Sequence, residues 1–145
     1  MDDLATPAFL ALCNMLERRA GLRYATVLSF VERDGVVHGR RDFTTVPDVY
    51  PTGTLKPLPQ DEWLDKICRR HQMHVANGAD AIRAAYPDHD TVFALGAARL
   101  ANFPIVIDGR CRAIFNVAQA DRDDWEALAV EAVDAGAVIA RLLQY

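Results

Sequence analysis

Cysteine, lysine and serine are all scarce in this sequence of 145 residues. The three cysteines, Cys13, Cys68 and Cys111, lie far apart and are odd in number, which argues against a disulfide framework. The only serine, Ser29, falls inside an apolar stretch without the sharp turn that exposes a nucleophile. The sequence therefore gives no sign of an extracellular disulfide scaffold or of a serine hydrolase.

Long apolar runs and a basic stripe are missing as well. The N-terminus, Met1-Asp2-Asp3-Leu4, lacks the basic and apolar regions of a signal peptide, and no run is long enough to cross a membrane. The net charge is −4, with both signs interleaved, whereas a phosphate backbone demands concentrated positive charge. We expect a cytoplasmic protein that binds neither nucleic acid nor membrane.

The length fits one domain spanning residues 1–145. A chain of this size buries roughly 68–70% of its unfolded surface, so its core needs neither a metal nor a disulfide. Half of the residues are apolar and a quarter are charged, which is ordinary globular composition. No internal repeat or linker divides the chain.

The first part of the sequence predicts a helix followed by a hairpin. Thr6 is suited to cap the helix, and Gly21 is suited to end it. Strands are expected over 24–32 and about 36–43. Asp34-Gly35 between them favours a type I′ turn, in which both central residues need positive φ.

The middle of the sequence is less regular. Residues 44–59 contain four prolines and one glycine and are predicted to form a long loop, a feature that is usually functional or disordered. A helix is expected over 60–71 and a short strand over 73–76. Two short helical pieces, about 79–85 and 88–95, follow.

A second hairpin and a long helix close the sequence. Strands are predicted over 100–107 and 111–118, joined by Asp108-Gly109. The last helix is expected over roughly 122–144, capped by Asp121. Its predicted buried stripe consists of Trp125, Leu128, Ala129, Ala132, Gly136, Ile139, Ala140 and Leu143.

The order of these elements predicts an α+β fold with a central antiparallel sheet. The first and last helices would share one face of the sheet, and the middle segment would cover the other. This arrangement predicts a concave pocket between the sheet and the middle segment, the kind of place where small molecules bind.

Residues spread over most of the chain resemble a known family. They are Tyr50-Pro51, Gly53, Lys56-Pro57, Trp63, Pro87-Asp88-His89, Leu95-Gly96, Asn102, Pro104-Ile105, Asp108-Gly109-Arg110 and Asn116. This set resembles short stand-alone bacterial GAF-domain proteins. The resemblance implies a sheet of about six strands, a small-molecule pocket and a homodimer formed through the terminal helices. A PAS-type domain is the alternative, and the helices at both ends favour GAF.

The sequence departs from the family pattern at two places. Ala97-Ala98-Arg99 stands where the relatives commonly carry a cysteine-glycine-serine run, which removes any thiol chemistry at position 97 and adds Arg99 as a cation. Ala113-Ile114 stands where a glycine-threonine pair is usual. These changes imply a pocket of different width or charge.

Seven residues are the candidate ligand-binding residues: Tyr50, Lys56, Trp63, His89, Arg99, Asn102 and Asn116. The two asparagines interrupt apolar strands, and a buried amide without a partner costs about 1–3 kcal/mol. Each therefore needs either a structural partner, such as backbone at a bulge, or a ligand. The sequence leaves both open.

The other candidates carry charge or aromatic surface. Lys56 is suited to neutralise an anionic ligand, with Tyr50 and Trp63 as stacking surface, although a solvated lysine and ordinary core aromatics fit equally well. His89, between two aspartates, is suited to act as an acid, a base or a pH sensor. In the alternative interpretation, Asp88 simply caps a short helix.

The spacing of Cys68, His71 and His74 invites comparison with a metal site, but a fourth ligand is missing. We therefore predict no metal, no cofactor and no catalytic residues. The leading hypothesis is a small-molecule-binding domain with a sensory or regulatory use, whose signal passes to a separate output protein. The alternatives are a small enzyme using His89 on an anionic metabolite and a dimeric interaction module without a ligand.

Overall fold

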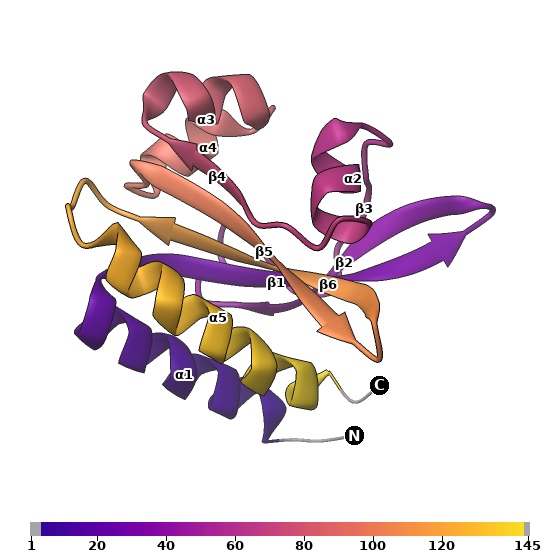
Figure 1. Cartoon of the computed structure of the whole chain (residues 1–145), viewed down its shortest axis with the longest axis horizontal. Coiled ribbons are helices and arrows are strands. Elements are labelled where there is room, and N and C mark those ends of the chain that lie inside the picture. The colour runs from indigo at the N-terminus through magenta and orange to yellow at the C-terminus, as the bar shows by residue number, and fades with distance from the viewer. Residues whose placement is uncertain (1–3, 144–145) are drawn as a thin grey trace.

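A computed structural model describes residues 4–143 and shows a central sheet covered by helices on both faces (Figure 1). The sheet has six strands in the order β3-β2-β1-β6-β5-β4, and every neighbouring pair is antiparallel. The strands are β1 (Leu22–Arg33), β2 (Val36–Thr44), β3 (Leu55–Pro57), β4 (His74–Asn77), β5 (Arg99–Ile107) and β6 (Arg110–Gln119). The predicted α+β fold is confirmed.

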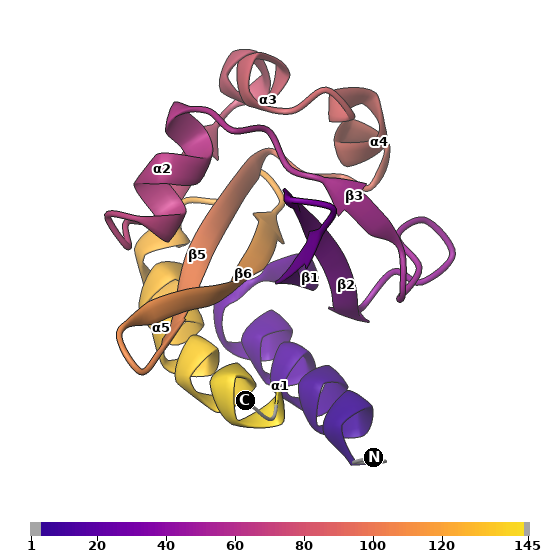
Figure 2. The same ribbon diagram turned by 90° about the vertical axis from the view of Figure 1, so that its right-hand side faces the viewer.

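The helices divide between the two faces of the sheet. The long helices α1 (Ala5–Ala20) and α5 (Trp125–Leu142) lie on one face. Three short helices lie on the other face, as Figure 2 shows: α2 (Glu62–Cys68), α3 (Ala79–Ala85) and α4 (His89–Ala94). No helix in the described part of the chain has the length and apolar character needed to cross a membrane.

Both predicted hairpin turns are present. Asp34 and Gly35 have φ values of 53° and 77° between β1 and β2. Asp108 and Gly109 have values of 53° and 76° between β5 and β6. Positive φ at both central residues matches the right-handed twist of the flanking strands. Each Asp-Gly pair therefore fixes the register of one hairpin.

The helix starts differ from the predicted ones. Leu4, not Thr6, occupies the cap position of α1, and no side chain caps it. The first turn accepts Pro7, which has no N–H, because the first four N–H groups of a helix have no partner within it. Helix α5 begins after Asp124 rather than Asp121, because β6 runs on to Gln119 and the chain needs the following residues to turn. Gly21 ends α1 in the left-handed region, as predicted.

The predicted long loop contains a short strand. Residues Leu55–Pro57 form β3 and pair with β2 at the edge of the sheet. The following helix is shorter than the predicted 60–71. It begins after Asp61, whose carboxylate accepts a hydrogen bond from Leu64 N, and His71 beyond its end has a positive φ of 52°.

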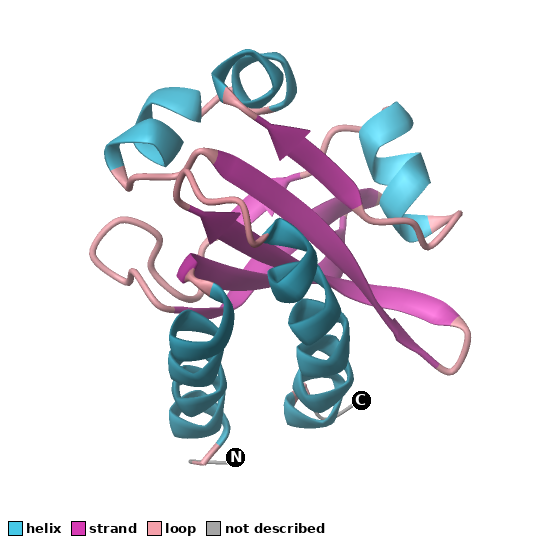
Figure 3. Cartoon of the chain, turned by 60° about the vertical axis from the view of Figure 1, so that its left-hand side comes forward, coloured by secondary structure: helices cyan, strands magenta, loops and turns pink. Residues whose placement is uncertain are grey.

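The larger core lies between the sheet and the two long helices, which run side by side in Figure 3. Phe9 stacks on Phe43 with ring centroids 5.1 Å apart and meets Phe115 edge-on. The buried residues of α5 are Leu128, Ala132, Ala135 and Ile139. Ala135 thus replaces the predicted Gly136 in this stripe, and the small side chains let α5 pack closely against α1.

Candidate ligand-binding site

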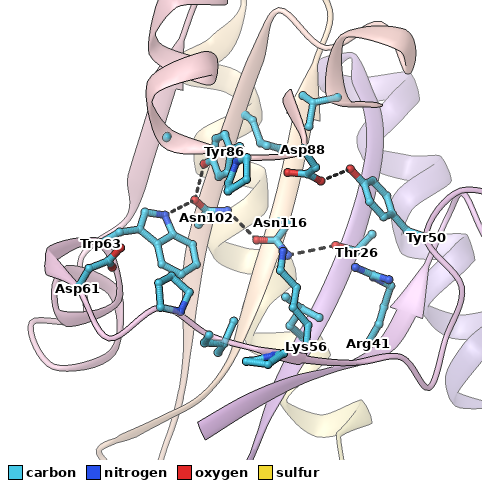
Figure 4. Close-up of a pocket in the computed structure, with 18 of the residues that line it drawn as sticks. Thr26, Arg41, Tyr50, Lys56, Asp61, Trp63, Tyr86, Asp88, Asn102 and Asn116 are labelled. Atoms are coloured by element: carbon cyan, nitrogen blue, oxygen red, sulfur yellow. Dashed lines mark hydrogen bonds between the residues drawn. The ribbon is translucent and has the colours of Figure 1, made fainter. Parts of the chain in front are cut away.

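A cavity of about 440 Å³ lies between the sheet and the segment that crosses its free face. This volume is within the roughly 300–1,000 Å³ typical of small-molecule sites. Its walls are largely apolar and aromatic, and Figure 4 shows the polar groups among them. The polar and charged lining residues are Tyr24, Thr26, Arg41, Tyr50, Lys56, Asp61, Trp63, Tyr86, Asp88, Asn102 and Asn116.

A row of polar residues crosses four neighbouring strands, and three of its members, Thr26, Asn102 and Asn116, form the floor of the cavity. Asn102 on β5 lies opposite Asn116 on β6, and Asn116 lies opposite Thr26 on β1. On the other side, His74 on β4 lies opposite Asn102. Residues paired in register point to the same face of a sheet, so these side chains meet in one line.

Asn102 is the centre of this row and is only 2% exposed. Its Oδ1 accepts hydrogen bonds from Trp63 Nε1 at 3.1 Å and from the Tyr86 hydroxyl at 2.6 Å. Its Nδ2 donates to Asn116 Oδ1 at 2.6 Å. Asn116 Nδ2 in turn donates to Thr26 Oγ1 at 3.1 Å. The helix α2 and the loop after α3 are therefore tied to the sheet through one amide.

These contacts give both asparagines a structural partner, although it is not the backbone that the sequence suggested. The partners are side chains on neighbouring strands and on the segment above them. The side-chain amide of an asparagine carries two N–H groups, and Asn102 and Asn116 each use one of them in this row. The row can thus hold its shape and still offer donors to a ligand.

A β-bulge brings Arg41 into the cavity. In the pairing of β1 with β2, Val27 lies opposite Phe43 and Leu28 lies opposite Arg41, which leaves Asp42 as the extra residue. A bulge interrupts the alternation of side chains and often re-aims one beside a functional site. Phe43 consequently packs in the helix-side core, while Arg41 lines the cavity on the opposite face.

Arg41 is a cation held inside the protein, with 8% of its surface exposed. Its Nη1 donates to the carbonyl of Pro51 at 3.2 Å, and its guanidinium lies 4.8 Å from the centre of the Tyr50 ring. Its buried Nε has no hydrogen-bond partner within the described chain. Burial lowers the pKa of Arg41, and the nearby Tyr50 and Asp88 act in the opposite direction.

Asp88 faces the cavity from the start of α4. It occupies the cap position of that helix, as the alternative interpretation predicted, but its side chain makes no capping hydrogen bond. Instead Asp88 Oδ2 accepts a hydrogen bond of 2.6 Å from the Tyr50 hydroxyl. Burial and this hydrogen bond raise the pKa of Tyr50, so the phenol stays neutral and keeps donating to the carboxylate.

Lys56 and Asp61 lie at the edge of the cavity formed by β3 and the start of α2. Asp61 is committed to capping α2. Figure 4 shows Lys56 and Arg41 on one side of the cavity, with Tyr86 and Asp88 across from them. Positive charge is therefore gathered on one side of the cavity, while the carboxylates of Asp61 and Asp88 already accept hydrogen bonds from groups of the protein.

Five of the seven candidate residues line this cavity, and His89 and Arg99 do not. His89 Nδ1 lies 3.1 Å from Asp90 Oδ1, and its ring is next to Phe93. Arg99 donates to Asn77 Oδ1 at 3.2 Å and to Gln119 Oε1, and its guanidinium lies over the Trp125 ring. The structure thus places Arg99 among residues that join the sheet to the start of α5.

Tyr24, Thr26, Arg41 and Tyr86 are among the cavity residues that the sequence did not identify. The Tyr86 hydroxyl is held by its hydrogen bond to Asn102, and the direction of the Arg41 side chain depends on the bulge. Of these four, only Thr26 could have been found from the sequence, because it is a polar residue within an apolar strand. No group of three or more metal-ligating side chains occurs in the described residues, and Cys68, His71 and His74 do not come together.

His74 gives a pH prediction. Burial lowers its pKa below the ordinary 6.5, with Lys66 acting in the same direction and a hydrogen bond between the ring and the Asn102 side chain opposing them. The unfolded chain then binds more protons than the folded one, so stability falls as the pH drops below about 6.5. Urea unfolding between pH 7.5 and 5.5 should show this slope in the wild type. His74→Gln should flatten it, and an unchanged slope would contradict the assignment.

The chain has structural likeness without sequence matches. No protein-family model and no curated protein matches this sequence. A GAF domain/HD domain protein from Geobacter sulfurreducens superposes with a TM-score of 0.65 at 12% identity, covering 100% of this chain and 97% of that one. The GAF domain of a two-component sensor histidine kinase from Bacillus halodurans gives 0.64 at 10% identity, covering 95% of each chain.

An enzyme shares the same architecture. The type II free methionine-R-sulfoxide reductase from Thermoplasma acidophilum superposes with a TM-score of 0.62 at 10% identity, covering 98% of this chain and 94% of that one. At sequence identities this low, the structural similarity supports a shared fold and carries no information about activity. The six-stranded antiparallel sheet, its two long helices and the covered cavity together show that this chain has the GAF-domain fold.

Proposed function

We propose that this protein is a small-molecule-binding domain of the sensory GAF type, and that its ligand is a planar molecule with an anionic group. The observation that carries the proposal is the 440 Å³ cavity, which the side chains of the middle segment leave open above a hydrogen-bonded polar floor. Sites of this kind combine apolar walls with a few placed polar groups. An interaction module without a ligand would have no use for such a cavity.

The charged groups favour an anion. The carboxylates of Asp61 and Asp88 accept hydrogen bonds from Leu64 N and the Tyr50 hydroxyl. The guanidinium of Arg41, by contrast, lines the cavity and donates to the backbone carbonyl of Pro51 rather than to a carboxylate. A carboxylate matches a guanidinium in shape and charge, and such contacts are about twice as strong as neutral hydrogen bonds.

The aromatic side chains favour a ligand whose anionic group is attached to a planar ring. Tyr24 and Tyr50 lie with ring centroids 6.2 Å apart, and Trp63 and Tyr86 approach the same cavity from α2 and the end of α3. Aromatic side chains offer large apolar area at low entropic cost, and their rings pack well on other rings. Binding would order α2 and the segment beside it, and a separate output protein would sense that change.

The experiment is native mass spectrometry of freshly purified protein, followed by thermal shift with matched probes. Indole-3-acetate and benzoate are compared with indole-3-acetamide and benzamide, which keep the ring and lose the charge. We expect the carboxylates to raise the Tm and the amides to raise it less. A Tm that none of the probes moves, with no co-purified molecule in the mass spectrum, would overturn the proposal.

We also expect a homodimer formed through the outer faces of the terminal helices. Val130 and Val133 of α5 are 66% and 63% exposed although they are apolar, and their spacing places them on one face. Light scattering at high concentration should give a dimeric mass, and Val133→Glu should weaken the dimer about tenfold or more. Val36→Glu, in the β1–β2 hairpin, is the control. A monomeric wild type rules the dimer out.

A further inference from the structure

A second cavity, of about 390 Å³, lies on the other side of α2 and brings two cysteines together. Cys68 is the last residue of α2, and Cys111 is the second residue of β6. They are separated by the segment that contains β4, α3, α4 and β5, yet their side chains are joined by a hydrogen bond. Both are half-buried free thiols on the wall of one cavity.

A second β-bulge creates this juxtaposition. In the pairing of β5 with β6, Ile105 lies opposite Ala113 and Val106 lies opposite Cys111, which leaves Arg112 as the extra residue. Ala113 packs in the helix-side core, whereas Cys111 faces α2. The bulge therefore re-aims Cys111 toward Cys68, just as the bulge in β2 re-aims Arg41.

We propose that Cys68 and Cys111 are a redox-active thiol pair, which a hydroperoxide oxidises to a disulfide that fastens the end of α2 to the sheet. Such a bond requires the two sulfurs to approach to about 2.0 Å, a short movement for thiols that already share a hydrogen bond. The cavity wall also carries Arg69, Arg110 and Arg112 against Glu32 and Asp65, an excess of positive charge that favours a thiolate.

The roles of the two sulfurs differ. The hydrogen bond from the Cys68 thiol lowers the pKa of Cys111, against the opposing effect of burial. The same hydrogen bond, together with burial, raises the pKa of Cys68. The surrounding charges agree with this difference, because Arg110 and Arg112 flank Cys111 on the cavity wall, whereas Asp65, one turn before Cys68 on α2, opposes a thiolate at Cys68. Cys111 is therefore the nucleophile toward the peroxide, and Cys68 is the thiol that resolves the product.

The reaction balances without any other reagent. The Cys111 thiolate attacks the peroxide oxygen, the O–O bond breaks, and an alcohol (water, from hydrogen peroxide) leaves with a proton as Cys111 becomes a sulfenic acid. The Cys68 sulfur then attacks the Cys111 sulfur, the S–O bond breaks, and water leaves with the second proton. The two thiols lose two electrons, and the peroxide gains them.

The consequence concerns the ligand cavity. Helix α2 lies between the two cavities, with Asp61 and Trp63 lining one and Leu64, Asp65 and Cys68 lining the other. A disulfide at its last residue would restrict the opening of α2 away from the sheet. Oxidation would therefore set how readily the wall that carries Trp63 moves.

The first test counts free thiols after treatment of the folded protein with hydrogen peroxide. The sample is denatured and alkylated with N-ethylmaleimide, and its intact mass is measured. The reduced protein should carry three adducts and the oxidised protein one, with full recovery after dithiothreitol. The remaining thiol is Cys13, which is 3% exposed and whose pKa burial raises to about 12. Three adducts after oxidation, or a disulfide-linked dimer, would overturn the proposal.

Variants assign the two roles and the effect on α2. Cys13→Ser should still lose two thiols, while dimedone should label Cys111 in Cys68→Ser and leave Cys68 unlabelled in Cys111→Ser. Hydrogen exchange of the α2 amides should slow by about threefold or more on oxidation, with α3 unchanged as the reference. Equal labelling of both variants would refute the assigned roles, and unchanged exchange would refute the tether. These outcomes do not depend on whether the other cavity binds a ligand.

Discussion

Replacing Asn102 by alanine is expected to lower the free energy of unfolding by about 3 kcal/mol. The amide is almost fully buried and accepts hydrogen bonds from Trp63 Nε1 and the Tyr86 hydroxyl while donating to Asn116. Alanine leaves three polar groups without their partner, and each such group costs about 1–3 kcal/mol unless water reaches it. Urea unfolding followed by circular dichroism measures the change.

The matched control is Asn77→Ala. Asn77 lies on the neighbouring strand β4, is exposed, and accepts one hydrogen bond from Arg99. Its loss should cost about 0.5 kcal/mol or less, as for most surface positions. If Asn102→Ala costs no more than this control, water replaces the amide and the polar row does not hold α2 and the Tyr86 loop in place.

The elements that the sequence predicted well are those determined by neighbouring residues. Asp34-Gly35 and Asp108-Gly109 predicted both hairpins, because few other dipeptides accept positive φ twice in succession. The apolar strands on both sides of these turns predicted a sheet covered on both faces. Together with the family resemblance and the order of the elements, these features predicted the layered fold. They also predicted the face of the sheet on which the cavity lies.

The cavity residues that the sequence missed depend on contacts between distant segments. A strict alternation of side chains along β2 would place Arg41 on the same face as Phe43, and only the bulge at Asp42 separates them. The hydrogen bond between Tyr50 and Asp88 joins residues that no local pattern relates. His89 is a candidate in the sequence because it lies between two aspartates, but its side chain lies next to Asp90 and outside the cavity. Residues that are neighbours in the sequence therefore need not point their side chains into the same cavity.

The second large effect concerns the proposed ligand. Arg41→Met should weaken the binding of indole-3-acetate by about 100-fold and leave the binding of indole-3-acetamide nearly unchanged, as measured by calorimetry. Losing one partner of a buried charge pair typically costs 2–5 kcal/mol, which corresponds to this range. Methionine fills much of the same space, so stability should fall by only about 1 kcal/mol through the lost hydrogen bond to Pro51.

Arg40→Met is the control that separates a specific contact from net charge. Arg40 is the preceding residue on β2, pairs with Asp42 at 3.0 Å and is absent from the cavity wall. Its replacement removes the same charge from the same strand, so any long-range attraction of an anion changes equally in both variants. Equal weakening in the two variants would show that the guanidinium of Arg41 acts only through the overall field. Weakening confined to Arg41→Met would place the anionic group of the ligand beside the bulge that turns this arginine inward.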